Sequence, residues 1–360
     1  MPASPLSRPI DLVIHIGLGK TGSSSIQYFL RDNRERLVEL GHLYPESPGR
    51  GRHTRLGLFI KSESELESSI EWYRQRQSDP GVFRRVFRRR LFSEIEGSGL
   101  SRVLFSDEGL AESSDTAMRR LRRFTDRIRK SLRLIVYLRR QDDHLVSHYQ
   151  QVVKVGETRR LAERTREVDL ADAYDYDVWL RRWEQLLEPD EFVVRRFERD
   201  SFVGGSLVQD FLDAAGIDAR AEDMAQGASR NISIDAESVE LLRLLNQHRV
   251  EHEGATVGLI DNRKLVAKLA EAAAGPTLTL PDPFLDRFMA RWDDANRAVA
   301  RRYLHDPAEE LFRMPRKTDN TTTEQHLDPD RLDHFLTLLE LPEQLHAPLR
   351  QLAEHEARVR

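Results

Sequence analysis

The sequence contains no cysteine, so disulfide bonds, thiolate metal sites and cysteine nucleophiles are excluded. It also has no uninterrupted apolar run that approaches the roughly 18 residues of a membrane-spanning helix. The N-terminal stretch has no apolar run of signal-peptide length either. We therefore expect a cytoplasmic protein without a transmembrane segment.

An excess of charge of one sign is also missing. The 56 lysines and arginines almost balance the 60 aspartates and glutamates, which leaves a formal net charge of −4. No global field therefore attracts nucleic acid or an anionic membrane. The 360 residues are enough for one large domain or two small ones with a sizeable core.

Short apolar runs alternate with helical patterns over the first part of the chain. Four runs have the composition of buried strands, at residues 10–16, 101–108, 132–140 and 191–197. Helical spacing of apolar residues predicts helices at 23–40, 115–131, 141–153, 176–187 and 206–216. This alternation predicts an α/β fold with a parallel β-sheet that is flanked by helices on both faces.

After about residue 230 only helical patterns remain, and a polar stretch precedes a last pair of short helices. We therefore expect one main domain over residues 8–315. Within it, an α/β core covers about 8–225 and a mainly helical part covers about 226–315. A polar loop and C-terminal helices follow over 316–360.

The first predicted strand runs into H-I-G-L-G-K-T-G-S-S-S, residues 15–25. A strand, a glycine turn and a helix place successive backbone N–H groups and a helix N-terminus around one small space, which favours an anion. The glycines also match G-x-G-x-x-G, but no second strand ending in an acidic residue follows about 20 residues later, as a dinucleotide site requires. The pattern G-x-x-x-x-G-K-[ST] fails as well, because Lys20 precedes Gly22.

What remains is the segment Lys20, Thr21, Gly22, Ser23 and Ser24, which supplies one cation and several hydroxyl and amide donors around a tetrahedral anion. It resembles the phosphosulfate-binding loop of the sulfotransferases that use 3′-phosphoadenosine 5′-phosphosulfate (PAPS). This resemblance implies a P-loop-like α/β fold. The alternative interpretation of the same residues is a serine-capped helix start with an exposed lysine.

A second motif, Y-L-R-R-Q-D-D-H-L-V-S-H-Y, puts Arg139 at a strand end and Ser147 eight residues later on the next helix. In the sulfotransferase family an arginine and a serine at this spacing hold the 3′-phosphate of the donor, and Asp143 falls where the family often has Asp. The fork of arginine donors and one hydroxyl suit a phosphate monoester. A surface ion pair for Arg139 and a helix-interior serine for Ser147 are the alternatives.

A third segment, E-F-V-V-R-R-F-E-R-D-S-F, resembles the family segment whose aromatic residue lies near the adenine, which here is Phe197. Core packing is the alternative role for that ring. The R-K-G loop that closes over the donor in many relatives is absent, because Arg316 and Lys317 are followed by threonine. Arg230 is one possible substitute. Two further stretches, 229–246 and 296–304, are similar to bacterial members of the family.

The resemblance implies transfer of a sulfuryl group from PAPS to a hydroxyl acceptor, with a carbohydrate as the expected acceptor, PAP as the product and no metal. Lys20 would balance the charge that develops on the leaving phosphate. Two residues are candidates for the general base. Glu108 follows the strand at 101–108, and ligands of open α/β sheets bind beyond the carboxyl ends of strands, so we expect it to face Lys20.

His53 is the second candidate base, since some sulfotransferases use a histidine. A loop salt bridge for Glu108 and an ordinary surface position for His53 are the alternatives. His15, within the first strand, is expected to be structural. His144 and His148 are expected to be exposed.

A run of five arginines within F-R-R-V-F-R-R-R-L-F, residues 83–92, surrounds an apolar helical stripe. Such a run is usually a solvated face, and the alternative is a docking surface for an anionic acceptor such as an acidic polysaccharide. Two other functions also remain open for the whole chain. A nucleotide or small-molecule kinase would need Mg²⁺, and a catalytically inactive nucleotide-binding module would bind the donor without turnover.

Overall fold

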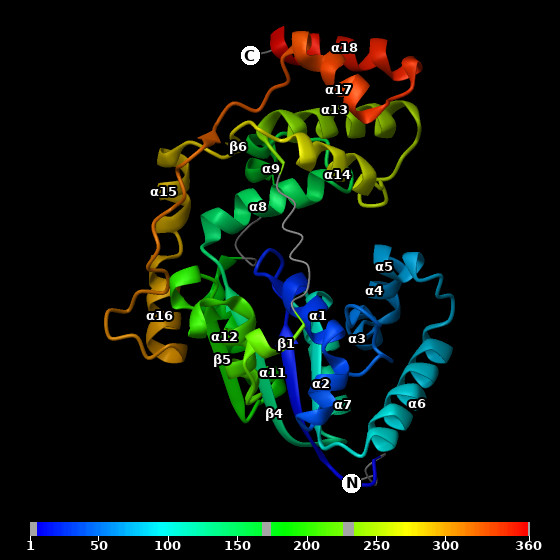
Figure 1. Cartoon of the computed structure of the whole chain (residues 1–360), viewed down its shortest axis with the longest axis vertical. Helices are drawn as coiled ribbons and strands as arrows, with labels where there is room; N and C mark the ends of the chain where they lie inside the picture. The colour runs from blue at the N-terminus through cyan, green and yellow to red at the C-terminus, as the bar shows by residue number, and fades with distance from the viewer. Residues whose placement is uncertain (1–5, 168–173, 226–233, 359–360) are drawn as a thin grey trace. The chain divides into compact units, whose positions relative to one another are not determined.

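The structure is a computed structural model that describes residues 6–167, 174–225 and 234–358 (Figure 1). The chain divides into two compact units. The first unit comprises Met1–Arg140, Asp175–Ser229 and Asp293–Met314, and the second comprises Gln141–Tyr174, Arg230–Trp292 and Pro315–Arg360. Every helix within the described ranges is too short or too polar to cross a lipid bilayer.

The first unit is built on a five-stranded sheet in which all neighbouring strands are parallel. The strand order is β2 (His42–Leu43), β3 (Arg102–Asp107), β1 (Ile10–Ile16), β4 (Arg129–Leu138) and β5 (Glu191–Arg196). In this register Ile16, the last residue of β1, lies opposite Asp107 of β3 and Val136 of β4. The carboxyl ends of the three central strands therefore meet at one edge of the sheet.

Alternate side chains of the central strands enter two separate apolar cores, one on each face of the sheet. On one face the helices are α1 (Ser23–Asp32), α2 (Arg34–Glu39) and α12 (Leu207–Ala215). The other face is covered by α3 (Thr54–Ile60), α4 (Glu63–Glu67), α5 (Ile70–Arg74), α6 (Pro80–Ser98), α7 (Asp115–Thr125), α11 (Tyr176–Leu187) and α16 (Asp293–Tyr303).

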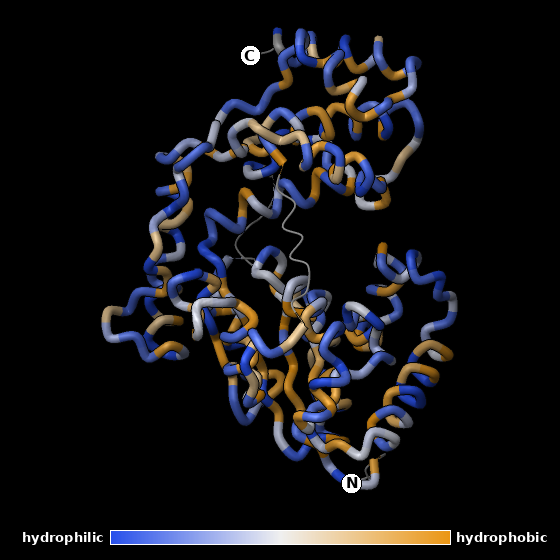
Figure 2. Tube along the Cα trace, viewed as in Figure 1, coloured by the Kyte–Doolittle hydropathy of each residue, from blue (hydrophilic) through white to orange (hydrophobic). Residues whose placement is uncertain are grey.

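Most of β1 and the second half of β4 are apolar, as the orange trace in Figure 2 shows, because both faces of these stretches are buried. The predicted α/β fold, a parallel sheet with helices on both faces, is confirmed.

The helix predicted at 23–40 is interrupted, and this difference has a local cause. At Asn33 the backbone leaves helical geometry (φ −113°, ψ 21°) between α1 and α2. The Asn33 side chain donates to the Phe29 carbonyl at 2.9 Å and exchanges hydrogen bonds with the backbone of Ala225, 192 residues away. The spacing of apolar residues does not reveal this tertiary contact. The sequence pattern therefore predicts one continuous helix where the structure has two.

The second unit is mainly helical. Its helices are α8 (Gln141–Val153), α9 (Leu161–Glu167), α13 (Ala236–His252), α14 (Arg263–Ala272), α15 (Asp282–Ala290), α17 (Leu332–Leu339) and α18 (His346–Arg358). Their apolar faces share one core, and two short parallel strands, β6 (Thr277–Leu278) and β7 (Thr321–Thr322), lie beside them. The domain boundaries expected from the sequence at residues 225 and 315 stay a prediction.

Candidate active site

The glycine-rich segment forms a tight loop between β1 and α1 in the first unit. The Gly17 amide donates to the Asp107 carbonyl at 3.1 Å, which holds the start of the loop against the end of β3. Two residues then adopt left-handed backbone conformations, Lys20 at φ 63° and Gly22 at φ 75°. Helix α1 begins directly afterwards, at Ser23.

Two hydroxyls of this loop point into it rather than toward a ligand. The Thr21 hydroxyl donates to the Leu18 carbonyl at 2.7 Å, and the Ser23 hydroxyl donates to the same oxygen at 2.9 Å. Both side chains are buried. Thr21 and Ser23 therefore fix the shape of the loop, and the donors that they can offer to an anion are their backbone amides.

The loop also presents a run of backbone amides. Within the part of the chain that the structure describes, no acceptor is recorded for the amides from Leu18 to Ser25. The first amide of α1 with a backbone partner is that of Ile26, which donates to Gly22. A run of such amides at a helix N-terminus is the arrangement that binds phosphate and sulfate groups.

Gly22 is packed too closely to carry a side chain. A Cβ atom there would lie 2.3 Å from Leu207 Cδ2, at the start of α12, and 2.9 Å from Phe197 Cε2. Its left-handed φ also favours glycine. Phe197 comes directly after β5 and is half-buried. Its ring lies against the loop at Gly22. Phe197 is the residue that the sequence analysis predicts to lie near the adenine.

Two cations lie at this loop. Arg139 follows β4 directly, and its guanidinium donates to the Lys20 carbonyl at 3.0 Å and lies 5.9 Å from the centre of the Phe197 ring. No carboxylate of the described residues lies within ion-pair distance of the Lys20 ammonium. Burial and the charge of Arg139 lower the pKa of Lys20, and the charge of Glu108 opposes both. An anion bound between these two cations would favour the charged lysine.

Glu108 is the acidic group of the site. It follows β3 and packs so closely on the loop that a Cβ on Gly17 would lie 2.9 Å from Glu108 Cγ. The Ser24 hydroxyl donates to Glu108 Oε1 at 3.3 Å. Burial raises the pKa of Glu108, against the opposing effects of Arg52, the Ser24 hydrogen bond and Lys20. The structure thus brings Glu108 and Lys20 to the same edge of the sheet.

Asp107, which sequence reasoning did not single out, anchors that edge. Its carboxylate accepts from the amides of Gly57 at 2.6 Å and Gly109 at 2.8 Å and is almost fully buried. Burial raises the pKa of Asp107 to about 7. Asp107 therefore ties α3 to the turn that carries Glu108. Its place beside Glu108 in S-D-E was the available signal, but its partner at residue 57 could not be read from the sequence.

His53 is completely buried, and both of its ring nitrogens have partners. Nε2 lies 2.8 Å from the Pro45 carbonyl, and Nδ1 accepts from the Ser106 amide at 3.3 Å. Burial lowers the pKa of His53 to about 3. His15 is also fully buried, and its Nδ1 lies within hydrogen-bond distance of Ser106 Oγ, at 2.8 Å. Burial lowers the pKa of His15 to about 3. Both rings connect segments near the end of β3.

The remaining predicted site residues belong to the second unit or lie outside the described residues. Ser147 and Asp143 are half-buried on α8, at the predicted strand-then-helix spacing from Arg139, but α8 belongs to the second unit. His144 and His148 are half-buried on the same helix, not fully exposed. Arg230 lies outside the described residues.

Arg316 is bound by three carboxylates of its own unit. Its nitrogens lie 2.9 Å from Asp142, 2.8 Å from Asp282 and 2.9 Å from Asp286. Its guanidinium is thus engaged by acidic groups of the second unit.

The fold and the loop together define an α/β protein in which backbone amides, a lysine and an arginine gather at the carboxyl edge of the sheet. No protein-family model matches the chain. It is 31% identical over 145 residues to an uncharacterized protein of Archaeoglobus fulgidus, a match that covers 40% of this chain and 38% of that protein. The match thus spans well under half the length of this relative.

Among solved structures, the chain is similar to a sulfotransferase from Alicyclobacillus acidocaldarius. The TM-score is 0.41 and the identity 15%, over 69% of this chain and 97% of that one. A likeness this distant carries no argument about function.

Proposed function

We propose that the protein is a sulfotransferase that transfers a sulfuryl group from PAPS to a hydroxyl acceptor, with a carbohydrate as the acceptor class. The observation that carries this proposal is the loop between β1 and α1. There, a run of amides without a recorded acceptor in the described residues surrounds Lys20, and Glu108 packs against the same loop.

The donor set of the loop suits the sulfuryl and 5′-phosphate groups of PAPS. Amides, a lysine and an arginine are all donors, and they meet at a helix N-terminus. Phe197 offers a ring face beside the loop for the adenine. Arg139 and Ser147 are proposed to hold the 3′-phosphate, with Arg230 as a further candidate. When bound, PAPS supplies an activated sulfuryl group and a phosphate as leaving group.

The chain's own residues then divide the work of the transfer. Glu108 would accept the proton of the acceptor hydroxyl as its oxygen forms the new bond to sulfur. The bond from sulfur to the bridging oxygen breaks, and Lys20 would balance the negative charge that grows on the 5′-phosphate. The loop amides would hold the non-bridging oxygens in place.

We favour Glu108 over His53 as the base for a physical reason. A base must reach the acceptor hydroxyl, directly or through one water. The His53 ring is fully buried, and each of its nitrogens already has a backbone partner. Glu108 is half-buried at the sheet edge, beside the loop.

Calorimetry on the full-length protein tests the proposal. PAP should bind, and ATP and NAD should bind at least tenfold more weakly, because neither carries a 3′-phosphate. Preferential binding of ATP, with turnover that a magnesium chelator abolishes, would show a kinase instead. PAP binding without turnover over a panel of glycan acceptors would show an inactive nucleotide-binding module.

A further inference from the structure

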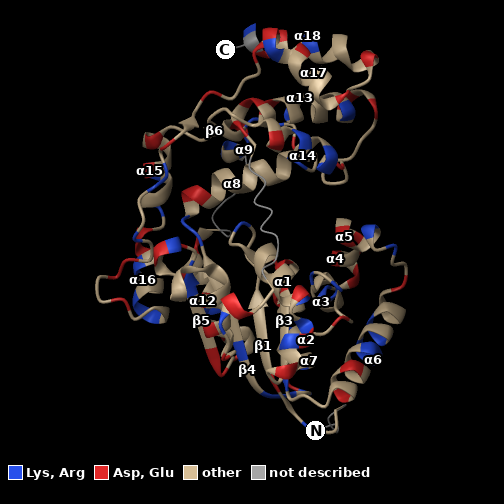
Figure 3. Cartoon of the chain, in the orientation of Figure 1, with Lys and Arg blue, Asp and Glu red and all other residues tan. Residues whose placement is uncertain are grey.

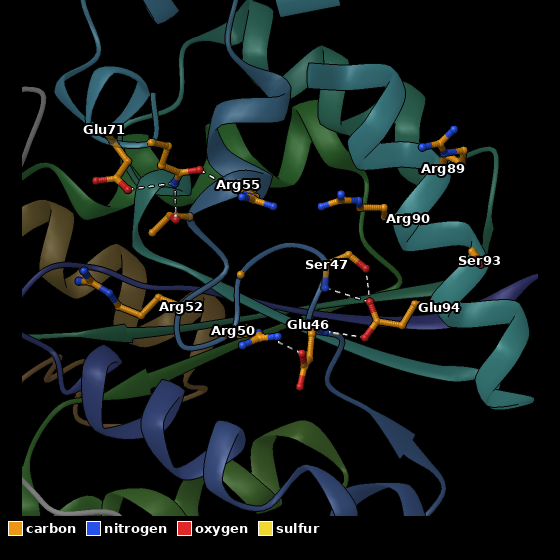
Figure 4. A pocket seen from close by; sticks show the side chains of 13 residues that line it. Glu46, Ser47, Arg50, Arg52, Arg55, Glu71, Arg89, Arg90, Ser93 and Glu94 are labelled. Atoms are coloured by element: carbon orange, nitrogen blue, oxygen red, sulfur yellow. Dashed lines mark hydrogen bonds and ion pairs between the residues drawn. The ribbon is translucent and has the colours of Figure 1, made fainter. Parts of the chain in front are cut away.

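A large cavity lined by charged and polar side chains lies in the first unit. Its volume is about 1080 Å³ (Figure 4), which is above the roughly 300–1,000 Å³ of pockets for drug-sized ligands. Its walls come from the loop before α3, from α3 and α5 and from α6, a helix along which Figure 3 shows several basic residues. Five arginines line the cavity: Arg50, Arg52, Arg55, Arg89 and Arg90.

Two of these arginines face each other across the cavity. Arg55 extends from α3 and Arg90 from α6, and their guanidinium groups point toward one another (Figure 4). Arg55 donates to Gln75 Oε1 at 3.3 Å. In the described part of the chain, no carboxylate lies within ion-pair distance of Arg52, Arg55 or Arg90. Like charges that converge without a carboxylate between them favour an anion from outside.

The acidic residues of the cavity have other partners. Glu94 accepts from the backbone amides of Glu46 at 2.6 Å and Ser47 at 2.9 Å, and so holds the loop before α3 onto α6. Glu71 accepts from Gln75 at 2.9 Å. These carboxylates do not neutralise the facing arginines. They leave acceptor oxygens on the same walls as the guanidinium donors.

The cavity is connected to the candidate active site through the backbone. The loop that carries Arg52 is bound to β3 by His53, whose ring accepts from the Ser106 amide. Helix α3, which carries Arg55, is bound to Asp107 through the Gly57 amide at 2.6 Å. Glu108 is the next residue after Asp107. The charge of Arg52 acts on Glu108, where it lowers the carboxyl pKa against the effect of burial.

We infer that this cavity is the acceptor site and that its ligand is an acidic oligosaccharide, a chain of sugars that carry carboxylate groups. This inference rests on the proposed sulfuryl transfer and names the class of its acceptor. Arg55 and Arg90 hold a carboxylate between them, and the neighbouring Glu71 and Glu94 accept hydrogen bonds from sugar hydroxyls. Arg52, whose charge acts on Glu108, lines the same cavity.

The mixed lining separates this ligand class from other polyanions. Guanidinium groups bind carboxylates through two parallel hydrogen bonds. Glutamates on the same walls repel any anionic group, but they can accept hydrogen bonds from sugar hydroxyls, which a chain of phosphates lacks. Room for several sugar rings agrees with the cavity volume of about 1080 Å³.

Calorimetry on the full chain without nucleotide tests the inference apart from any transfer. The probes are two acidic tetrasaccharides with different backbones, tetragalacturonate and unsulfated chondroitin tetrasaccharide, and the fully methyl-esterified form of tetragalacturonate. Esterification removes charge and keeps size and hydroxyls, so the ester should bind at least tenfold more weakly. Arg55→Gln and Arg90→Gln should each lower the affinity for the more tightly bound acidic probe by roughly tenfold.

The matched control is Arg85→Gln, an exposed arginine of α6 that does not line the cavity. It should leave affinity unchanged. The two test variants lie on different helices, so misfolding of one, seen by circular dichroism, leaves the other decisive.

The inference is overturned if neither acidic probe binds at millimolar concentration, if the ester binds equally well, or if Arg85→Gln matches Arg90→Gln. Tetrapolyphosphate that binds as tightly as the better acidic probe would also overturn it. PAP titrated into the same protein reports on the donor site separately. Acidic-probe binding without PAP binding would refute the sulfotransferase and keep the cavity as an acidic-sugar site.

Discussion

The substitution Gly22→Ala isolates the loop geometry on which the site depends. The new methyl group would have to sit at φ 75°, where an L-residue costs about 1–2 kcal/mol. It would also lie 2.3 Å from Leu207 Cδ2, and overpacking of this kind costs typically about 1–3 kcal/mol. Together these effects predict a loss of about 2–5 kcal/mol in the free energy of unfolding of the first unit.

Differential scanning calorimetry measures this loss. For a unit of about 150–250 residues, each kcal/mol shifts Tm by about 2–4 °C, so Gly22→Ala should lower Tm by roughly 4–20 °C. Gly19→Ala is the matched control in the same loop, because a Cβ there would meet nothing within 4 Å. Its effect on Tm should be within a few degrees.

The double variant Gly22→Ala with Leu207→Ala separates the two causes. Removal of the leucine side chain relieves the closest contact and leaves the backbone cost of about 1–2 kcal/mol together with the 2.9 Å approach to Phe197 Cε2. The coupling between the two substitutions should therefore be favourable by at least about 1 kcal/mol. Equal effects of Gly22→Ala and Gly19→Ala, or strictly additive effects with Leu207→Ala, would refute the loop geometry.

The remaining predictions concern chemistry and pH. Lys20→Ala should lower kcat by roughly 10²–10³ and PAP affinity by less, measured by steady-state kinetics and calorimetry, because the lysine acts mostly in the transition state. Glu108→Gln should lower turnover by roughly 10²–10⁴ with PAP affinity intact, and normal turnover would reject Glu108 as the base. Burial raises the pKa of Glu108, so wild-type kcat should rise with pH through a pKa above that of an ordinary glutamate. Burial lowers the pKa of His53 from 6.5 to about 3. Between these two pH values the unfolded chain binds a proton at His53 that the folded chain does not bind. Stability should therefore fall below pH 6.5 by about 1.4 kcal/mol per pH unit for this residue. In urea unfolding at pH 6, 5 and 4, His53→Gln should reduce the slope by this amount and leave the equal contribution of His15.

The sheet could be predicted from the sequence because its signals are local. The strand predicted at 10–16 is β1, and the helices predicted at 141–153 and 176–187 coincide with α8 and α11. Each of these segments has the apolar pattern that is typical of its own type of element, a short apolar run for a strand or helical spacing for a helix. The pattern can be recognised without knowledge of distant contacts. The short β2 was missed because two residues carry no period.

The site could be predicted only where the rule of parallel strands applied. That rule put Glu108 and Lys20 at one edge, and the structure places them there. Three features of the site could not be predicted. The Thr21 hydroxyl is held by a hydrogen bond within the folded loop. Asp107 and His53 are held by hydrogen bonds to segments that are distant in the sequence. Residue type and spacing alone contain none of these contacts.

The central claim is that this loop and Arg139 hold a nucleotide with a 3′-phosphate. Calorimetry with PAP and 5′-AMP, on the wild-type protein and Arg139→Ala, tests it most directly. Loss of a charge-assisted contact costs about 1.5–3 kcal/mol, so PAP should bind the wild-type protein roughly 10- to 100-fold more tightly than 5′-AMP. Arg139→Ala should erase most of that difference, and PAP should lose more affinity than 5′-AMP, for which Arg139 contributes only at the loop. Equal affinity of the wild-type protein for the two nucleotides would contradict the account.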